Sequence, residues 1–435
     1  MKLSPDQKTA WRKLKFWIED QNHPSKTFVL RGYAGTGKTY LVGGMLPTLV
    51  NSHFYYTAPT NKATKELSKA LRGTETKTTF SLLGLRMEQD EDQMVMNFTG
   101  KTPPSFSRSS IIVVDECGTL GDEIFAFLMR VSARILFIGD PAQLPPVGYR
   151  TSKSWSSAKD FREDCNYLLT QVMRYDNCLL EVATELRDCI KNREYDSSPL
   201  SRTRLDSTGN GLTVHGSYID FKKTCLPALV DDPERSRLLA WRNSKVHSWN
   251  NSVREALGFE DDYCVGDRLM LASPVKDEND TIIAYIDDDL VVEECIQSTV
   301  KIPAHSDSGF PEDCNIRVWS LMTRYPDSKD VLSLSIPMES ELSRLASILN
   351  RKAAAAKRTS SSFPRKLIWE NFWSTKDLFN SVRYGWALTC HRAQGSTYDN
   401  VFIEQYDILS NKNPDEAHRC LYVAESRASK NVHTY

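Results

Sequence analysis

A glycine-rich segment that follows an apolar run constrains the fold of this chain more than any other feature. The run at 27–30 reads Thr-Phe-Val-Leu, and residues 32–39 read Gly-Tyr-Ala-Gly-Thr-Gly-Lys-Thr, followed by a helical stretch from Lys38. This is the full pattern of a phosphate-binding loop between a strand and a helix, in which backbone N–H groups curl around phosphate oxygens. The segment therefore predicts an α/β domain that binds a nucleotide, rather than a chance glycine-rich turn.

Each position of this loop has a chemical role in that pattern. The glycines allow the close turn, Lys38 would neutralise the β- and γ-phosphates, and Thr39 would ligate Mg²⁺. ATP and Mg²⁺ are therefore the expected cofactors. Gly43, Gly44 and Pro47 predict that the following helix is short or bent. The residues expected to bind the nucleotide in this loop are Gly32, Gly35, Thr36, Gly37, Lys38 and Thr39.

A pair of adjacent carboxylates follows a second apolar run. Asp115 and Glu116 come directly after Val113-Val114. At the carboxyl end of a buried strand beside a phosphate loop, Asp115 would hold Mg²⁺ through water, and Glu116 would orient and polarise the attacking water. Without the loop, such a pair would more often be a solvated turn, so this interpretation depends on the loop.

The first third of the chain alternates short apolar runs with helical stretches. Further apolar runs lie at 53–57, 111–114 and 134–138. Runs of four or five apolar residues bounded by turns indicate a parallel sheet with helices on both faces. Residues 83–108 interrupt this rhythm and are predicted to form a small insertion, such as a hairpin.

A second alternating set occupies the other half of the chain. It contains a helix predicted at 179–191 and a strand at 237–240. The rhythm breaks at 260–376 and resumes afterwards, which predicts a second α/β domain split by an insertion of about a hundred residues. Within the insertion, alternating β-like patterns precede a helix predicted at 339–357. Residues 351–366 contain six Lys or Arg and no acidic residue, and Ser360–Ser362 with Pro364 are predicted to mark a loop after this helix.

Composition excludes several classes of protein. The net charge is −1, from 55 Lys+Arg and 56 Asp+Glu, so a wholly basic nucleic-acid coat is excluded and any nucleic-acid site must be a local groove. No apolar run approaches the roughly 18 residues of a membrane span, and the polar start shows no secretory signal. The ten cysteines contain no CxxC pair, which favours reduced thiols in a cytoplasmic protein over a zinc site.

Three further segments narrow the class of nucleotide-binding protein. Residues 139–147 read Gly-Asp-Pro-Ala-Gln-Leu-Pro-Pro-Val, residues 389–396 read Thr-Cys-His-Arg-Ala-Gln-Gly-Ser, and residues 421–428 read Leu-Tyr-Val-Ala-Glu-Ser-Arg-Ala. In order and spacing, they resemble motifs III, V and VI of superfamily 1 DNA helicases. The compact length and the insertions are most similar to the phage Dda-type helicases of the RecD-like branch.

The resemblance implies an architecture of two tandem RecA-like domains with parallel sheets. The first would span 1–185, with a pin insertion at about 83–108. The second would comprise 186–259 and 377–435, and 260–376 would be an inserted SH3-like domain with a helical tower.

The same resemblance implies roles in ATP hydrolysis. Gln7, in Leu-Ser-Pro-Asp-Gln, would bind the adenine edge, although the segment also fits an ordinary helix N-cap. Gln143 would sense the γ-phosphate, and Gly395 would belong to the nucleotide site. Arg174 and Arg427 would be arginine fingers, because a planar guanidinium can bind the developing γ-phosphate charge through two hydrogen bonds.

Contacts with DNA are implied in the same way. Thr60 and Asn61 match motif Ia, and Thr78 begins the next block. Phe80 stands where the family usually has histidine. A polar contact with DNA is therefore not expected there, but the aromatic ring could stack on a base. Phe98 falls where Dda-type helicases carry the tip of a strand-separating pin, and His391 of motif V would contact DNA; the alternatives are a hydrophobic anchor for Phe98 and a structural role for His391.

Two departures from the family pattern stand out. Cys117-Gly118 replaces the serine-containing segment usual after the acidic pair. Glu425 replaces an apolar residue beside Arg427, which makes it a candidate buried charge. Neither change removes a group that hydrolysis requires.

The resemblance predicts an ATP-dependent DNA helicase that moves 5′-to-3′ on single-stranded DNA and opens duplex junctions. We expect a monomer without membrane contact, located in the cytoplasm, or in the host cytoplasm if phage-encoded; a single-strand-binding protein or replication proteins are the further partners. The alternatives are a superfamily 1 RNA helicase, a translocase that displaces bound proteins, or a non-catalytic nucleic-acid-binding module. The hydrolytic residues named above argue against the last.

Overall fold

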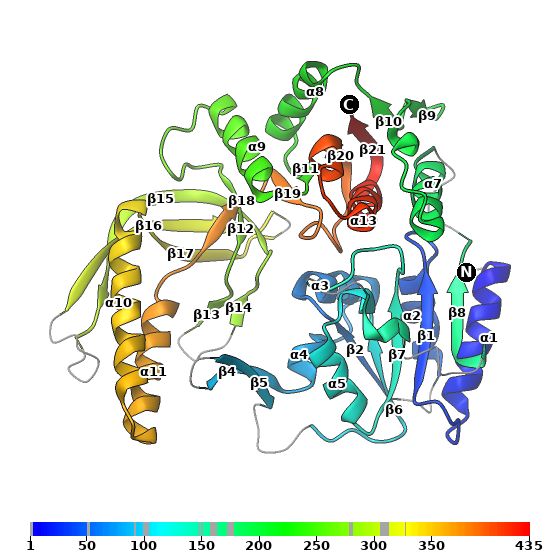
Figure 1. Ribbon diagram of the computed structural model, residues 1–435, viewed down its shortest axis with the longest axis horizontal. Helices are drawn as coiled ribbons and strands as arrows, with labels where there is room; N and C mark the ends of the chain where they lie inside the picture. The colour runs from blue at the N-terminus through cyan, green and yellow to red at the C-terminus, as the bar shows by residue number, and fades with distance from the viewer. Residues whose placement is uncertain are drawn as a thin grey trace. The chain divides into compact units, whose positions relative to one another are not determined.

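The computed structural model describes most of the chain as two compact units (Figure 1). The first unit comprises Met1–Ala228, Arg235–Val246 and Leu388–Tyr435, and the second comprises Leu229–Glu234 and His247–Ala387. The residues described are 3–49, 53–90, 93–98, 104–146, 148, 151–156, 163–171, 178–277, 282–304, 313–326 and 328–435. Within these ranges, no helix is both long and apolar enough to cross a membrane.

The first sheet of the first unit has six parallel strands in the order β3-β2-β6-β7-β1-β8. Every residue of β6 and β7 is buried, as expected for a sheet covered on both faces. One face packs on α1, α2 and α3, and the other on α5. The strands are β1 (Thr27–Gly32), β2 (His53–Ala58), β3 (Thr76–Thr78), β6 (Ser110–Val114), β7 (Arg134–Gly139) and β8 (Asn166–Leu169); the helices are α1 (Pro5–Glu19), α2 (Lys38–Met45), α3 (Asn61–Ala70), α4 (Thr79–Leu82), α5 (Asp122–Arg130) and α6 (Lys153–Ser156).

The predicted insertion at 83–108 contains an antiparallel hairpin of β4 (Leu85–Asp90) and β5 (Gln93–Phe98). Asp90 pairs with Gln93 beside the connection, whereas Phe98 pairs with Leu85 at the opposite end. The prediction that Phe98 lies at the tip of the pin is therefore wrong, because the chain reverses before β5 begins rather than after it. Whether Phe98 contacts DNA stays a prediction.

The second sheet has the order β19-β11-β20-β21-β10-β9. Its β11, β20, β21 and β10 pair in parallel, and the short β9 adds to β10 antiparallel. The strands are β9 (Arg204–Leu205), β10 (Gly211–Val214), β11 (Ser236–Ala240), β19 (Ala387–Thr389), β20 (Tyr398–Ile403) and β21 (Ala428–Thr434); the helices are α7 (Cys178–Asn192), α8 (Tyr218–Asp231), α9 (Asn243–Ala256), α12 (Gln405–Leu409) and α13 (Pro414–Glu425).

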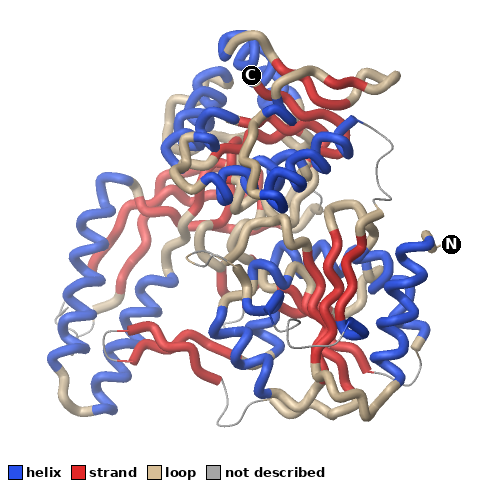
Figure 2. Tube along the Cα trace, turned by 45° about the vertical axis from the view of Figure 1, so that its right-hand side comes forward, coloured by secondary structure: helices blue, strands red, loops and turns tan. Residues whose placement is uncertain are grey.

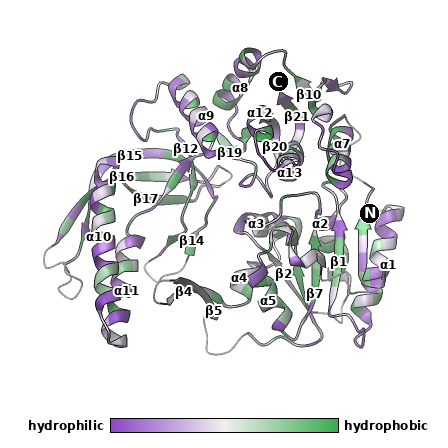
Figure 3. Ribbon diagram, in the orientation of Figure 1, coloured by the Kyte–Doolittle hydropathy of each residue, from purple (hydrophilic) through white to green (hydrophobic). Residues whose placement is uncertain are grey.

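Hydropathy follows this layering in the central strands of the first sheet, such as β7, which are drawn mainly in green (Figure 3). The parallel first sheet and the mainly parallel second sheet confirm the predicted α/β class and its tandem arrangement. The exact boundaries of the three predicted domains stay predictions. Short 3₁₀ turns occur at Leu46–Thr48, Cys117–Thr119, Glu163–Cys165 and Ser198–Leu200.

The second unit combines an antiparallel sheet with a pair of helices (Figure 2). The sheet has the order β17-β16-β15-β12-β18, and α10 packs along α11. The helix predicted at 339–357 is confirmed as α10, whereas the loop expected at Ser360–Pro364 is shorter than predicted, because α11 begins at Ser362 and tolerates Pro364 in its first turn. The elements are β12 (Arg268–Leu271), β13 (Val275–Lys276), β14 (Ile282–Ala284), β15 (Asp289–Ile302), β16 (Cys314–Arg324), β17 (Val331–Pro337), β18 (Val382–Tyr384), α10 (Glu339–Arg358) and α11 (Ser362–Asp377).

Candidate functional site

The phosphate-binding loop lies between the end of β1 and the start of α2. Gly37 has φ +79°, and a Cβ there would come within 2.5 Å of Gln7 Nε2. A Cβ on Gly32 would come within 2.7 Å of Thr36 Oγ1. A side chain at Gly37 would be strained by this φ, and one at Gly32 would require Thr36 to move, so glycine suits both positions of a loop that approaches a phosphate closely. The helix after the loop is only eight residues long and passes into a 3₁₀ turn, as predicted.

Lys38 supplies the positive charge of this loop. Its Nζ donates hydrogen bonds to the carbonyl oxygens of Gly32 at 2.6 Å and of Tyr33 at 2.9 Å. The ammonium is thus held over the loop by the chain's own backbone. Thr39 follows it in the first turn of α2, where a hydroxyl can join a metal ion to the phosphates. The glycine cradle, the ammonium and the hydroxyl together fit a nucleoside triphosphate.

The two carboxylates Asp115 and Glu116 follow β6, at the same edge of the sheet as the phosphate loop. The N–H of Asp115 donates to the carbonyl of Thr57 at 2.9 Å, and its Oδ1 accepts the N–H of Glu116 at 2.9 Å. Burial, together with repulsion from Glu116, raises the pKa of Asp115 to about 7, although the attraction of Lys38 acts in the opposite direction. These three groups are therefore within electrostatic range of one another.

The backbone of Glu116 is strained. It has φ +50°, in the left-handed region that non-glycine residues rarely adopt. Such conformations persist only where the surrounding structure enforces them, and they cluster at active sites. The geometry is consistent with the predicted role of Glu116 in orienting water, a role that stays a prediction.

Gln7 connects α1 to the phosphate loop. Its Nε2 donates to the carbonyl of Thr36 at 3.1 Å, while its Oε1 accepts the N–H of Ser4 at 3.1 Å. Ser4 in turn caps the helix through a hydrogen bond from the Gln7 N–H. The structure therefore contains the helix cap and also brings Gln7 to the loop. Its contact with adenine stays a prediction.

Contacts from α13 reach this site, and the sequence analysis did not identify them. The Tyr422 hydroxyl donates to Asp140 Oδ2 at 2.6 Å and accepts the N–H of Ala34 at 3.2 Å. Arg419 Nη1 donates to the carbonyl oxygens of Pro141 at 2.8 Å and Gln143 at 2.9 Å. The sequence contained one signal for these contacts. Arg419 and Tyr422 are three residues apart, so their side chains lie on the same face of a helix.

The two predicted arginine fingers have different outcomes. Arg174 lies outside the described residues. Arg427 is 6% exposed, and its guanidinium donates to the carbonyl oxygens of Val423 and Ser396 at 3.2 Å and to the Ser426 hydroxyl at 2.9 Å. These hydrogen bonds hold Arg427 to segments of the second sheet. The approach of Arg427 to the nucleotide stays a prediction, and it requires these bonds to break.

Several buried polar atoms lie in the motif segments without a hydrogen-bond partner among the described residues. Gln143 Oε1 is one, in the segment after β7. Gln394 Nε2 and Ser396 Oγ flank Gly395, and Glu425 Oε2 ends α13. A buried polar atom without a partner is costly, and similar atoms also occur outside the motif segments, as at Asp122 Oδ1 and Asn411 Nδ2.

Predicted DNA-contact residues gather at the start of α3. Thr60 is exposed and caps this helix by accepting the N–H of Ala63 at 3.2 Å, and Asn61 is its first residue. The nearest atoms to a Cβ built on Gly395 belong to Ala63, at 3.9 Å. The structure therefore places Gly395 beside the predicted DNA segment, and its predicted role in nucleotide binding stays untested.

The remaining predicted DNA contacts are more dispersed. Thr78 caps α4 by accepting the N–H of Ser81 at 3.1 Å. Phe80 is half-buried and packs on the core of the first sheet. His391 Nε2 lies 3.9 Å from Glu416 Oε1, and burial lowers its pKa despite that carboxylate. These observations leave contact with DNA as a prediction for all three.

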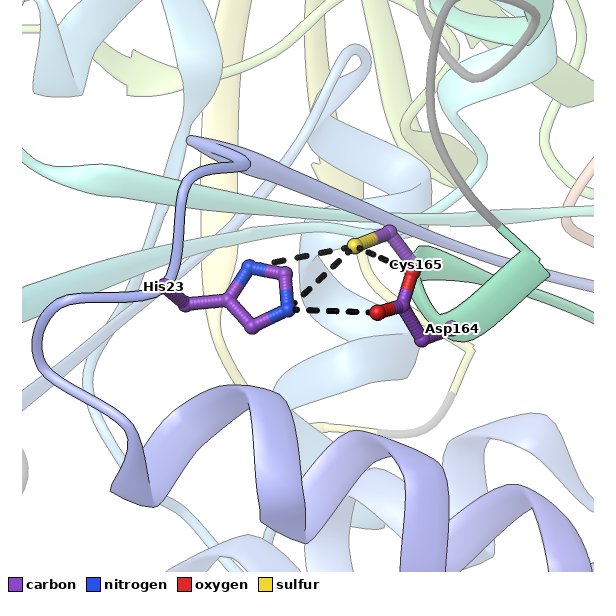
Figure 4. Close-up of side chains that lie close together, drawn as sticks. All are labelled: His23, Asp164 and Cys165. Carbon is purple, nitrogen blue, oxygen red and sulfur yellow. Dashed lines mark hydrogen bonds and ion pairs between the residues drawn. The ribbon is translucent and has the colours of Figure 1, made fainter.

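Two groups of side chains have the composition of metal ligands. In the first, His23 lies beside Asp164 and Cys165 (Figure 4). His23 Nδ1 accepts the N–H of Ser25 at 3.1 Å, which places the ring proton of the neutral imidazole on Nε2, the atom that faces Asp164 Oδ2 at 3.8 Å. A protonated Nε2 cannot bind a metal, so this arrangement favours an ordinary polar contact.

The second such group is His391, Glu416 and Cys420. A hydrogen bond with Cys390 and burial raise the pKa of Cys420 well above its ordinary value. A thiol that keeps its proton is a poor ligand. All ten cysteines are free thiols, and neither group is assigned as a metal site.

Comparisons with known proteins agree with this geometry. An AAA domain family matches residues 18–149, and a UvrD-like helicase C-terminal domain matches residues 384–435. The chain is 26% identical to the ATP-dependent DNA helicase dda of Enterobacteria phage T4, over 99% of this chain and 98% of the relative. It is 24% identical to the uncharacterized protein R530 of Acanthamoeba polyphaga mimivirus, over 98% of each.

Among solved structures, a Pif1 helicase described as unwinding forked double-stranded DNA through two coordinating molecules shares the fold. Its TM-score is 0.52 at 15% identity, and the alignment covers 100% of this chain and 92% of that one.

Proposed function

We propose that this chain, which belongs to the Pif1/Dda-like superfamily 1 helicases, hydrolyses ATP to move along single-stranded DNA and to separate duplex strands. One arrangement carries the proposal. Lys38 and the pair Asp115-Glu116 lie at the same edge of the first sheet, close enough for Lys38 to act on the charge of Asp115, and a helix of the second sheet hydrogen-bonds to the loop that carries Lys38. A nucleotide held between two such sheets can change how they pack.

In this proposal the first sheet supplies the chemistry. Lys38 stabilises the charge that develops on the γ-phosphate, and Glu116 orients the attacking water. Thr39 and Asp115 would hold Mg²⁺, which would neutralise charge on the phosphate oxygens. Gln143, whose Oε1 has no partner among the described residues, would respond to the γ-phosphate.

The second sheet would supply the response. Arg427, and Arg174 in the segment before α7, would complete the site when the two sheets approach. Alternating grip on the strand, through the start of α3 and the segment around His391, would then give net movement. The proposed direction, 5′-to-3′, is taken from the resemblance to Dda-type helicases.

The test is ATP turnover by the purified chain with and without single-stranded DNA. We expect DNA to accelerate turnover strongly, and equal rates in both conditions would contradict the proposal. Duplexes with a 5′ or a 3′ tail would then report the direction, and single-stranded RNA would separate a DNA helicase from an RNA helicase.

The wider setting follows from the same proposal. We propose a monomer that acts in the cytoplasm, or in the host cytoplasm if phage-encoded, at junctions of single- and double-stranded DNA. A single-strand-binding protein or replication proteins would be its partners. Sedimentation of the protein with and without a forked duplex would test the monomer.

A further inference from the structure

We propose that Tyr422 is a positioning residue through which α13 couples contact with DNA to the phosphate loop. The inference rests on the proposed function and deepens it by naming the connection between its two sites. Tyr422 belongs to the second sheet's helix, yet both hydrogen-bond partners of its hydroxyl belong to the first sheet's loops.

The hydroxyl is fully committed by these two bonds. It donates to Asp140 Oδ2 at 2.6 Å and accepts the N–H of Ala34 at 3.2 Å, while Asp140 Oδ1 accepts the N–H of Ala142 at 2.9 Å. The Tyr422 side chain is completely buried. Burial and the neighbouring Asp140 carboxylate raise the Tyr422 pKa well above its ordinary value, so the phenol keeps its proton. The contact is therefore directional and charge-assisted.

The partners of this hydroxyl lie at functional points of the first sheet. Ala34 is part of the glycine-rich loop, whose N–H groups serve phosphate binding. Asp140 begins the segment that leads to Gln143, and Arg419 holds the same segment through the carbonyl oxygens of Pro141 and Gln143. A shift of α13 would therefore displace the loop and the predicted γ-phosphate sensor together.

The other end of α13 faces the predicted DNA segment. Glu416, in its first turn, lies 3.9 Å from His391. Residues 389–396 also carry Gly395, which lies beside the start of α3. Since α13 is one continuous helix from Pro414 to Glu425, it connects a point near the predicted DNA contacts to a point on the phosphate loop as a stiff element.

A second contact supports the same connection. The Arg187 guanidinium, from α7, lies 4.1 Å from the centre of the Tyr33 ring, in the phosphate loop. The side chain of Arg187 is 8% exposed, so this cation–π contact is shielded from water. This cation–π contact would persist after removal of the Tyr422 hydroxyl. Removing the hydroxyl would therefore change only the hydrogen bonds of Tyr422.

The test compares Tyr422→Phe with the wild type. The variant keeps the ring and its packing but loses both hydrogen bonds. We expect kcat with saturating single-stranded DNA to fall about tenfold, the effect of a lost hydrogen bond to a charged group, while KM for ATP changes less than about twofold. A purely structural role would instead lower the melting temperature without a selective loss of DNA stimulation.

Tyr435→Phe is the matched control. Its hydroxyl donates to Glu404 Oε2 at 2.7 Å, within the second sheet's own segments. This variant should keep the wild-type ratio of DNA-stimulated to DNA-free turnover. A Tyr422→Phe protein that also keeps this ratio would overturn the inference and leave the proposed function standing. A wild type without DNA stimulation would overturn the proposed function, and the inference with it.

Asp140→Asn provides an independent route if Tyr422→Phe folds poorly. It weakens the acceptor and leaves the tyrosine in place. If the two groups act as one connection, the double variant should be no more impaired in DNA stimulation than the more affected single variant. Multiplicative losses would show that they act separately and would overturn the inference.

Discussion

Two strand–turn–helix segments, one after β1 and one after β11, have the same outline, but their backbone N–H groups have different partners. After β1, the turn into α2 consists largely of glycines and ends at Lys38. After β11, the turn into α9 is Trp241-Arg242, and both of its N–H groups donate to Asp407 Oδ2, at 2.8 and 2.9 Å. The Asp407 side chain is fully buried, and its Oδ1 also accepts from Arg242 Nε at 2.5 Å.

The difference shows how one architecture serves two purposes. In the second sheet, a carboxylate of the protein occupies the position of an anion at the start of a helix, where backbone N–H groups and the helix dipole favour negative charge. In the first sheet, the glycine-rich turn leaves the corresponding position, at the start of α2, open to a phosphate. We therefore expect only the first turn to bind a nucleotide, and the second sheet to act through α13.

The largest expected effect comes from Lys38→Ala. Removing the ammonium should lower ATP turnover by at least about 10²–10³-fold, because a positioned charge on the transferring phosphoryl group is lost. Its hydrogen bonds to two loop carbonyls contribute little to the fold, so the melting temperature should change by no more than about 2–4 °C. Turnover with DNA and a thermal melt check the two parts. Retained DNA-stimulated turnover would refute the assignment of the phosphate site.

Asp407→Asn should lower the stability of the fold without affecting the binding of ATP. The variant loses a charged acceptor that serves two N–H groups and Arg242, so we expect the free energy of unfolding to fall by about 1–3 kcal/mol. KM for ATP should not change, because the affected turn binds no nucleotide. Denaturant unfolding and ATP kinetics measure the two quantities.

Glu19→Gln is the control for this variant. Glu19 forms an exposed ion pair with Lys15 at 3.6 Å, and such pairs contribute at most about 1 kcal/mol. If Asp407→Asn raised KM for ATP while the control did not, the second turn would contribute to nucleotide binding, and the contrast between the two turns would be wrong.

The sequence predicted the first of these turns and not the second. The glycine pattern and Lys38 are local signals, because a close approach of backbone to phosphate requires particular residues in order. The Asp407 contact joins residues more than 160 positions apart, and no local pattern marks a buried carboxylate that caps a distant turn. The alternation of apolar runs was enough for both parallel sheets, since each buried strand carries its own signal.

At the site, too, the contacts that the sequence did not predict depend on the tertiary structure rather than on a local pattern. Resemblance identified Gln143 and Arg427 but gave no sign that Arg427 would be tied to Val423 and Ser396. Tyr422 went unnoticed because a tyrosine on an apolar helix face usually fills a core. Phe98 was placed at the tip of a hairpin whose register the sequence does not fix, since pairing depends on where the chain reverses.

The smallest expected effect concerns another buried carboxylate of the second sheet's segments, Glu425. Unlike Asp407, its Oε2 has no hydrogen-bond partner among the described residues. Burial raises its pKa to about 8, although Arg187 and Arg427 attract the charged form. Between its ordinary pKa of 4.5 and about 8, the unfolded chain has lost this proton and the folded chain retains it. Stability should therefore fall as the pH rises through this window.

Glu425→Gln removes that dependence, because an amide does not ionise. From pH 6 to pH 7, the wild type should lose up to about 1.4 kcal/mol more stability than the variant, the equivalent of one proton over one pH unit. Melting curves of both proteins at the two pH values measure the difference, and other titrating groups cancel because both proteins contain them. Parallel changes would mean that Glu425 is ionised in the folded protein, paired with Arg187 or Arg427 as Asp407 is paired with Arg242, and the contrast between the two carboxylates would disappear.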